Sequence, residues 1–426
     1  MLKPLYVLVV LIAGAGACRA IEIATGKMLG TDYDQRSFYV RAGAGRWART
    51  YSGAQFRPEA AGRMMNLRIA QGIFHDEWLT EAPFDPDAHT ARIIAALDTY
   101  KAHGILAISV SLQGANMAYE VASTIRRTRD AKPGPAKGAL MSAFHSDGSP
   151  KKPWLDRALR LAKELDRRGM VLNLIYFYAH QDEVLENTAA IDRAAVNATD
   201  WIIDNNLRNV VVEIANEHDV NAWDHDRYVH NEIGKLIQLA RSRFDAKRAR
   251  FRVPISASTG GGMRVYDGVR SYGDLTIVHG NNQPPEKKRA RIAELVADPA
   301  MPGPIYMNED DNGRATTPTN LKKELASCDA VFESGGSWGY MPWRQLQIFP
   351  FAHVLPSRLA EVRDDTAPEH RDPAYFNLVL KHIRSLVFTE KAIAKLERAA
   401  KPRRPDTRAP NEFPMPSQRP CITCSR

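Results

Sequence analysis

The chain has 426 residues, of which 44% are apolar and 25% are charged. This is ordinary globular composition, and it excludes a largely disordered, collagen-like or multi-span membrane protein. Four cysteines are too few for a disulfide-rich scaffold. The net charge of +9 is concentrated in residues 391–426, which carry nine Lys or Arg and three Asp or Glu. Residues 1–390 are therefore nearly balanced, and we expect no nucleic-acid partner.

The first 17 residues have the three parts of a secretory signal peptide. Lys3 supplies the positive start, Leu5–Ala13 is an apolar run, and Ala15-Gly16-Ala17 forms a small-residue cleavage site before Cys18. The apolar run is far shorter than the roughly 20 residues that span a bilayer. We expect an exported protein that is periplasmic, extracellular or anchored to a membrane through a lipidated Cys18.

Beyond residue 60, apolar strand-like runs alternate with amphipathic helical patterns. The predicted strands are Met65–Phe74, Ile105–Leu112, Val171–Phe177, Val210–Ala215, Pro254–Ala257, Leu275–Val278, Pro304–Met307 and Gly336–Tyr340. The helical patterns include His89–Lys101, Trp154–Arg168, Ile191–Asn206, Asp226–Arg243 and Glu286–Ala297. Eight such units predict an α/β protein of the (β/α)8 TIM barrel class. An open doubly wound sheet is the alternative, but no G-x-G-x-x-G follows the first strand, and we expect no cofactor.

The barrel organises the rest of the chain into segments. These are a signal peptide (1–17), a short N-terminal lead-in (18–60), the barrel (61–350), a C-terminal helical extension (351–400) and a disordered basic tail (401–426). The long stretch Arg129–Pro153 would lie at the mouth of the barrel, where long loops are commonly functional. Cys328, in a predicted helix, is expected to be a buried small apolar side chain.

Polar residues gather where the predicted strands end, and in a barrel these ends share one mouth. Strand four reads VVVEIANEHD and ends in Asn216-Glu217, and strand seven reads PIYMNEDD and ends in Asn308-Glu309. Two carboxylates facing each other across the mouth are the pair that a retaining glycosidase needs. We therefore expect Glu217 to be the acid/base and Glu309 to be the nucleophile.

Other strand-end residues are candidates for substrate binding. Asn216 could hydrogen-bond a sugar 2-hydroxyl, and His279 could orient the nucleophile or contact the sugar. His180 is a further candidate, and the strand-eight aromatics Trp338, Tyr340 and Trp343 could stack on a sugar face.

Three charged residues near the strand ends receive no catalytic role from the pattern. Asp310 and Asp311 are expected to be helix-cap or surface acids. No arginine is expected at the end of strand one, because Arg68 comes too early in the predicted Met65–Phe74 strand.

The Asn-Glu pair of strand four and the Glu of strand seven resemble the retaining glycoside hydrolases of clan A, which include the cellulase-like family 5. The stretch AFHSDGSPKKPWLDRALRLAKELDRRGMVLNLIYFY looks like the region before the third strand of such enzymes. The resemblance covers roughly residues 60–345 and implies a (β/α)8 barrel that cleaves O-glycosidic bonds of a poly- or oligosaccharide by double displacement. The chain departs from the cellulase pattern at His218-Asp219, where a proline commonly follows the glutamate.

Two alternative functions stay open. The first is a non-catalytic carbohydrate-binding pseudoenzyme of the same fold. The second is a metal-dependent barrel hydrolase, because His and Asp recur at the strand ends: His75, Asp76, His180, Asp182, His218, Asp219 and His279. Strand one lacks the H-x-H usual in such barrels and no H-E-x-x-H occurs, so we expect no metal.

Overall fold

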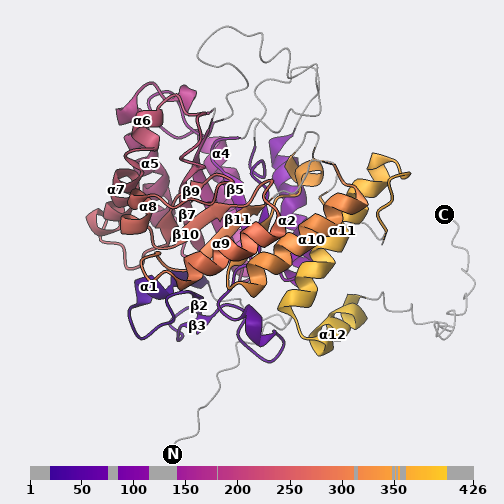
Figure 1. The fold of residues 1–426 in the computed structure, drawn as a ribbon. Helices are drawn as coiled ribbons and strands as arrows, with labels where there is room; N and C mark the ends of the chain where they lie inside the picture. Colours follow the sequence, from indigo (N-terminus) through magenta and orange to yellow (C-terminus); the bar gives the residue numbers. More distant parts are fainter. Residues whose placement is uncertain are drawn as a thin grey trace, which may run out of the picture.

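The computed structural model describes residues 20–74, 85–114, 142–179, 181–310, 315–347, 351, 354–355 and 361–400. They form a parallel barrel with helices around it, a small sheet at its N-terminus and helices at its C-terminus (Figure 1). The predicted signal peptide, Cys18, the tail after residue 400 and residues 115–141 before and within the predicted mouth loop lie outside the described residues. Within the described part, no helix combines the length and the apolarity needed to cross a bilayer.

All eight predicted strands are present in one parallel sheet. Its members are β4 (Asn66–Arg68), β5 (Ala107–Ser111), β6 (Val171–Tyr178), β7 (Val210–Asn216), β8 (Ile255–Ser256), β9 (Ser258–Thr259), β10 (Thr276–His279), β11 (Ile305–Asp310) and β12 (Ser337–Tyr340). The segments β8 and β9 flank Ala257 and are two halves of the fifth strand: β8 pairs with β7, and β9 pairs with β10. Because β12 also pairs with β4, the sheet closes into a barrel.

The first strand is shorter than the prediction of Met65–Phe74. It ends at Arg68, and the next residues turn, with the Gly72 amide donating to Ile69 and the Phe74 amide donating to Gln71. Ile69 and Ala70 still form hydrogen bonds with the backbone of β5. Ile73 and Phe74 lie beyond this pairing and are buried, so their burial produced the rest of the strand-like pattern.

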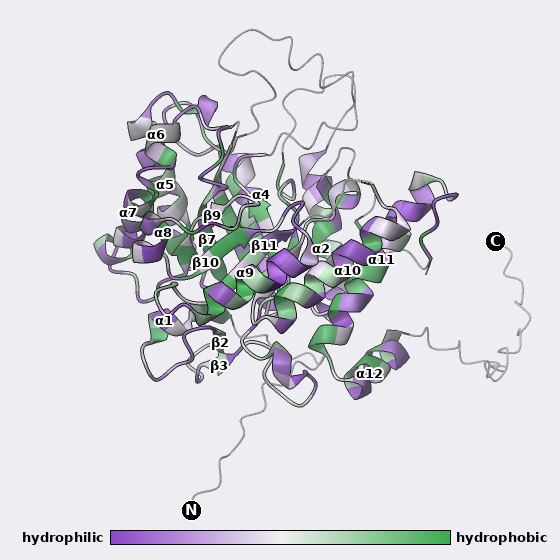
Figure 2. Cartoon of the chain, in the orientation of Figure 1, coloured by the Kyte–Doolittle hydropathy of each residue, from purple (hydrophilic) through white to green (hydrophobic). Residues whose placement is uncertain are grey.

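Helices cover the outside of the barrel, as the 3.6-residue period predicted for most of them. The predicted helix Asp226–Arg243 is interrupted by a turn at residues 230–232, and the short helix Asp267–Tyr272 was not predicted. They are α2 (Pro86–Ala102), α4 (Lys152–Arg167), α5 (Thr188–Asp204), α6 (Asp226–Val229), α7 (Ile233–Ala246), α8 (Asp267–Tyr272), α9 (Pro285–Ala297) and α10 (Pro318–Glu333). Local signals set several starts: the side chains of Asp85, Asn187 and Thr317 cap α2, α5 and α10. Hydrophobic and hydrophilic residues alternate along helices such as α9 and α10 (Figure 2), and the buried residues of α5 and α7 are almost all apolar.

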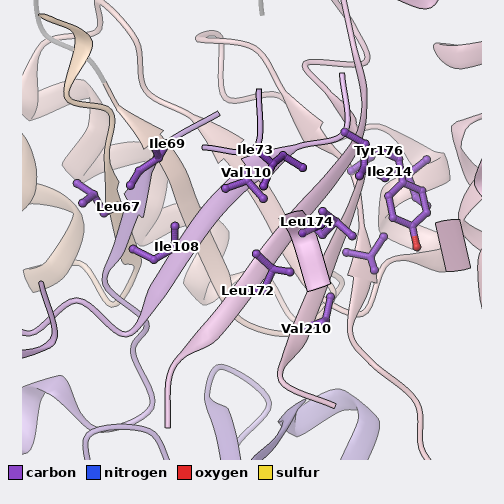
Figure 3. Close-up of a cluster of buried hydrophobic side chains, with 14 of the residues drawn as sticks. Leu67, Ile69, Ile73, Ile108, Val110, Leu172, Leu174, Tyr176, Val210 and Ile214 are labelled. Atoms are coloured by element: carbon purple, nitrogen blue, oxygen red, sulfur yellow. The ribbon is translucent and has the colours of Figure 1, made fainter. Parts of the chain in front are cut away.

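Strand residues alternate between the helix layer and the barrel interior. Leu172 and Leu174 of β6, with Ile108 and Val110 of β5, pack in the apolar layer between sheet and helices (Figure 3). The residues between them, Ser109 and Asn173, face the other way and are polar and fully buried, as is Glu213 between Val212 and Ile214 of β7. The interior of the barrel is therefore polar in its middle, which places charge beneath the mouth.

The lead-in forms a small antiparallel sheet of β1 (Ile21–Thr25), β2 (Phe38–Ala42) and β3 (Ala48–Arg49), with α1 (Gly26–Leu29) and the short helix η1 (Pro58–Ala60). Ile23 and Phe38 pack against residues at the amino ends of the barrel strands, among them Val171, Val211 and Tyr306. In Figure 1 this sheet lies beneath the barrel. It closes the amino end and leaves the carboxyl ends of the strands as the mouth.

The C-terminal extension consists of α11 (Pro368–Val387) and α12 (Glu390–Ala400), and it follows the short helix η4 (Trp343–Gln347). Tyr375, Phe376, Val379, Leu380 and Ile383 of α11 belong to the main core, so this helix packs on the barrel as predicted. Cys328 of α10 is buried and free, which confirms the prediction for that residue.

Candidate active site

Glu217 follows β7 and occupies an unusual backbone conformation. Its φ is +51°, in the left-handed region that residues with a side chain rarely adopt, and such strain is concentrated at functional sites. Two contacts hold the turn: Ser258 Oγ accepts the Glu217 amide at 2.9 Å, and Trp223 Nε1 donates to the Glu217 carbonyl at 3.0 Å. The side chain is 21% exposed, so the carboxylate is rigidly aimed yet open to the mouth.

Glu309 lies in β11 and is almost completely buried, with 3% of its side chain exposed. One oxygen accepts a hydrogen bond and the other forms an ion pair. Asn281 Nδ2 donates to Oε1 at 2.6 Å, and the guanidinium Nε of Arg68 lies 2.6 Å from Oε2. The carboxylate is therefore fixed in orientation and paired with a buried positive charge.

His279, at the end of β10, lies between the two glutamates. Its Nδ1 is 2.9 Å from Glu217 Oε1 and 3.7 Å from Glu309 Oε2. One atom of each of the three side chains lies within 4.8 Å of the others. The sequence-predicted pair is thus brought together, with one oxygen of each glutamate within 4.8 Å of the other. This proximity is compatible with the roughly 5–5.5 Å between carboxyl groups in retaining glycosidases.

The charge state of His279 follows from its neighbours. Complete burial on its own would lower the pKa of His279, but the charge of Glu309 and the contacts with Glu213 and Glu217 outweigh burial and raise that pKa to about 10. A pKa this high makes the ring an imidazolium at neutral pH, with Nδ1 hydrogen-bonded to Glu217 and Nε2 lying 3.8 Å from Glu213 Oε1.

Arg68 corrects the sequence prediction, which placed it too early to reach the mouth. Because β4 ends at Arg68, this side chain is at a carboxyl strand end like the others. It is fully buried and contacts Glu309, Glu213 and the Oδ1 of Asn216. Because the Asn216 Oδ1 accepts from Arg68, the Nδ2 group of the same amide can donate to another partner.

The strand-eight aromatics differ in position. Trp338 is fully buried, donates from Nε1 to Asp310 Oδ2 at 2.9 Å, and stacks on Tyr340, which is also buried. Neither ring offers a free face to a sugar. Trp343 is 6% exposed and packs with Met341 in a separate small cluster.

Asp310 was predicted to be a cap or surface acid, and this prediction is wrong. Its side chain is fully buried, where Oδ1 accepts from Lys288 Nζ at 2.6 Å and Oδ2 accepts from Trp338. The Lys288 side chain is itself completely buried and reaches Ser327 Oγ at 2.9 Å. This ion pair fixes the end of β11 directly after Glu309.

Several strand-end predictions fall outside the described residues: His75, Asp76, His180 and Asp311. Of the others, Asp182 pairs with His225 at 3.1 Å, and His218 packs against the rings of His230 and Tyr266. Asp219 accepts the Gly260 amide at 2.7 Å. These side chains are spread over different contacts and form no shared centre within the part of the chain that the structure describes.

Among the described residues, the group of metal-ligating side chains close enough to share a cation is Glu217, His279 and Glu309. The surroundings do not suit a cation, because the guanidinium of Arg68 already lies on Glu309. A metal ion placed there would meet this fixed positive charge.

Two side chains missed by the sequence reasoning complete the site. Asn281 follows His279 by two residues, and its contact with Glu309 depends on the turn after β10. Glu213 lies inside β7 beneath the pair. A lone glutamate within the apolar run VVVEIAN was the available signal, since a charged residue in a buried strand needs a partner.

No protein-family model matches the chain, and no curated protein matches it. Several solved structures match it in fold. An exo-β-1,4-mannosidase from Opitutaceae bacterium strain TAV5 is 12% identical, with a TM-score of 0.45, covering 84% of this chain and 67% of that one. A GH5-4 broad specificity endoglucanase from Bacteroides salanitronis is 8% identical, with a TM-score of 0.47, covering 77% and 94%. The β-glycosidase of Thermosphaera aggregans is 9% identical, with a TM-score of 0.44, covering 80% and 99%.

The chain is thus structurally similar to family 5 and related clan A glycoside hydrolases. Identities of 8–12% and TM-scores below 0.5 describe a related arrangement of strands and helices only. We infer the function from the side chains of this chain.

Proposed function

We propose that the protein is a retaining glycoside hydrolase acting on a poly- or oligosaccharide. The observation that carries this proposal is the pair Glu217 and Glu309, whose oxygens approach within 4.8 Å at the mouth of a barrel. Their environments differ: Glu309 is buried against a guanidinium, whereas Glu217 is partly exposed. If residues 1–17 direct export as expected, the substrate is met outside the cytoplasm.

In the first step, a carboxylate oxygen of Glu309 attacks the anomeric carbon while the bond to the leaving oxygen breaks. Glu217, protonated at this stage, gives its proton to that oxygen. In the second step, Glu217 takes a proton from a water molecule, and the resulting hydroxyl displaces Glu309 from the anomeric carbon. Two inversions return the original configuration.

Neighbouring side chains supply the remaining functions. Asn216 has its Oδ1 occupied by Arg68, so Nδ2 can donate to a sugar 2-hydroxyl. Arg68 and Asn281 hold the Glu309 carboxylate in one orientation before attack. The structure places Trp343 in the short helix η4, shortly after strand eight. We propose Trp343 for sugar stacking because it keeps 6% of its surface exposed, whereas Trp338 is fully buried.

The test is covalent labelling. A panel of 2-deoxy-2-fluoro glycosides with activated leaving groups should label the wild-type protein once, and mass spectrometry of peptides should place the label on Glu309. The Glu309→Gln variant should take no label, because an amide cannot displace the leaving group. The matched control is Glu186→Gln, an exposed carboxylate paired with Arg193, which should label like the wild type.

Other outcomes decide between the alternatives. Label on a residue other than Glu309 removes it as the nucleophile. Sugar binding that survives in Glu217→Gln and Glu309→Gln, with no hydrolysis of any aryl glycoside by the wild type, assigns a non-catalytic binder. If a chelator abolishes hydrolysis, the protein is a metal-dependent hydrolase. Product stereochemistry read by NMR should show retention.

A further inference from the structure

A third carboxylate, Glu213, lies beneath the pair inside the barrel. It is fully buried and projects from β7. Its Oε2 accepts from Asn173 Nδ2 at 3.1 Å and from Asn308 Nδ2 at 2.5 Å. The two amides come from β6 and β11, so Glu213 is tied to strands on both sides of the barrel.

Glu213 also lies against both cations of the site. Its Oε2 is 3.5 Å from Arg68 Nη1, and its Oε1 is 3.8 Å from His279 Nε2. Each cation thus bridges Glu213 to the carboxylates above it: Arg68 reaches Glu309, and His279 reaches Glu217 and Glu309. The proposed reaction uses Glu217 and Glu309 but leaves Glu213 without a role.

The charges balance only when Glu213 is ionised. The first step needs Glu309 as a carboxylate and Glu217 as an acid. With Arg68 and His279 both positive, a negative Glu213 makes the five groups neutral, and a neutral Glu213 leaves an uncompensated buried positive charge. The other groups nearby do not change this sum, because the Tyr178 phenol of β6 is neutral and Lys288 is paired with Asp310.

We propose that Glu213 is a positioning residue that stays ionised, keeps His279 as an imidazolium and holds the Arg68 side chain toward Glu309. Its effect on turnover rests on the proposed function, whereas its effect on the charge of His279 does not. Burial alone would raise the pKa of Glu213, but the positive charges of Arg68 and His279 lower that pKa to about 2.

The experiment is NMR of the imidazole nitrogens in protein carrying 15N-labelled histidine. The signal of His279 among the twelve histidines is assigned by its loss in His279→Gln. In the wild type, the ring should be protonated at pH 8. In Glu213→Gln, the midpoint of its deprotonation should fall by at least one pH unit, a tenfold loss of proton affinity.

Two variants separate this role from a general structural one. Ser109→Ala removes a hydroxyl from the same buried layer, where it contacts Asn66 and Asn173, without changing any charge. It should leave the His279 midpoint unchanged. Glu213→Asp keeps a negative charge and should hold the midpoint between those of the wild type and Glu213→Gln. If Glu213→Gln does not fold, the aspartate variant still reports the shift.

A neutral His279 ring at pH 8 in the wild type overturns the proposal, as does an unchanged midpoint in Glu213→Gln. The NMR result stands apart from catalysis: a protein that no fluorinated glycoside labels, but whose His279 responds to Glu213, refutes only the proposed function. If the enzyme is active, the pH at which kcat/KM falls on the basic side should be lower by at least one pH unit in Glu213→Gln. It should be unchanged in Ser109→Ala.

Discussion

Arg68 connects as many side chains of the site as His279 does. From the end of β4 its guanidinium reaches Glu309 of β11 and two side chains of β7, Glu213 and Asn216. A planar guanidinium can serve three partners in fixed directions, whereas an ammonium acts as one compact charge. The orientation of the nucleophile therefore depends on the shape of this group as well as on its charge.

Arg68→Lys is expected to lower kcat/KM by roughly 10–100-fold, the equivalent of one lost charged hydrogen bond. The positive charge stays, but lysine cannot hold Glu309 and Asn216 together. The measurement is steady-state hydrolysis of the best aryl glycoside. Arg160→Lys is the matched control, because Arg160 forms only a surface contact with Asp87, and it should leave kcat/KM unchanged. Equal kinetics in Arg68→Lys and the wild type would contradict the proposed orienting role.

The strand-end pattern predicted part of this constellation and missed the rest for physical reasons. Glu217, His279 and Glu309 were recognised because each directly ends a strand or lies near its end, and the structure brings them together. Arg68 was missed because buried turn residues after it look like more strand. The role of Glu213 depends on which way a side chain points inside the barrel, and this follows from the registers of neighbouring strands.

At the scale of elements, β12 and β11 approach each other closely at Gly339. A methyl group placed there would meet the backbone of Asn308, with its carbonyl carbon at 2.6 Å and its Cα at 2.8 Å. Asn308 directly precedes Glu309, so the absence of a side chain at Gly339 lets the eighth strand close the barrel beside the nucleophile.

Gly339→Ala is expected to destabilise the fold by about 1–3 kcal/mol, because the backbone of β11 must move to make room. Chemical denaturation followed by tryptophan fluorescence measures the change. Gly262→Ala provides the comparison, since a methyl group there has its nearest neighbour at 3.9 Å, and the free energy of unfolding should change by less than about 0.5 kcal/mol. A Gly339→Ala protein as stable as the wild type would show that the strands can separate freely.

The order and type of the barrel elements were predictable, because strands and helices differ in the period of their apolar residues and several helices begin at a capping side chain. The position of the small N-terminal sheet was not predictable. Ile23 and Phe38 look like ordinary strand residues in the sequence, and their position under the barrel arises from contacts with Val211 and Tyr306, far along the chain. Such long-range packing has no local signature.

For the whole molecule, buried ionisable groups predict how stability changes with pH. The pKa of His279 is raised to about 10, so its stabilising contribution is complete below pH 6.5 and is lost as the pH rises through 10. Burial lowers the pKa of His89 and of His218 to about 4, so their contributions are complete above pH 6.5 and are lost as the pH falls through 4. The free energy of unfolding should therefore be greatest near pH 6.5.

Urea denaturation between pH 4.5 and 9.5 tests this expectation. The free energy of unfolding should decline on the alkaline side by at most about 1.4 kcal/mol per pH unit for the single His279 proton. His279→Gln should be less stable at pH 6.5, and its alkaline decline should be smaller by that amount. An alkaline decline of equal slope in the variant and the wild type would assign it to other groups.

Closure of the barrel joins strands from opposite ends of the sequence: Asn66 and Leu67 of β4 pair with Gly339 and Tyr340 of β12. During translation, β4 leaves the ribosome long before its neighbour exists, and one of its hydrogen-bonding edges stays open until residue 340 has been added. A chain released earlier would expose the edge of β4 and the edge of β11 together. Open strand edges pair with other molecules, so prematurely terminated products of this gene are the species expected to aggregate.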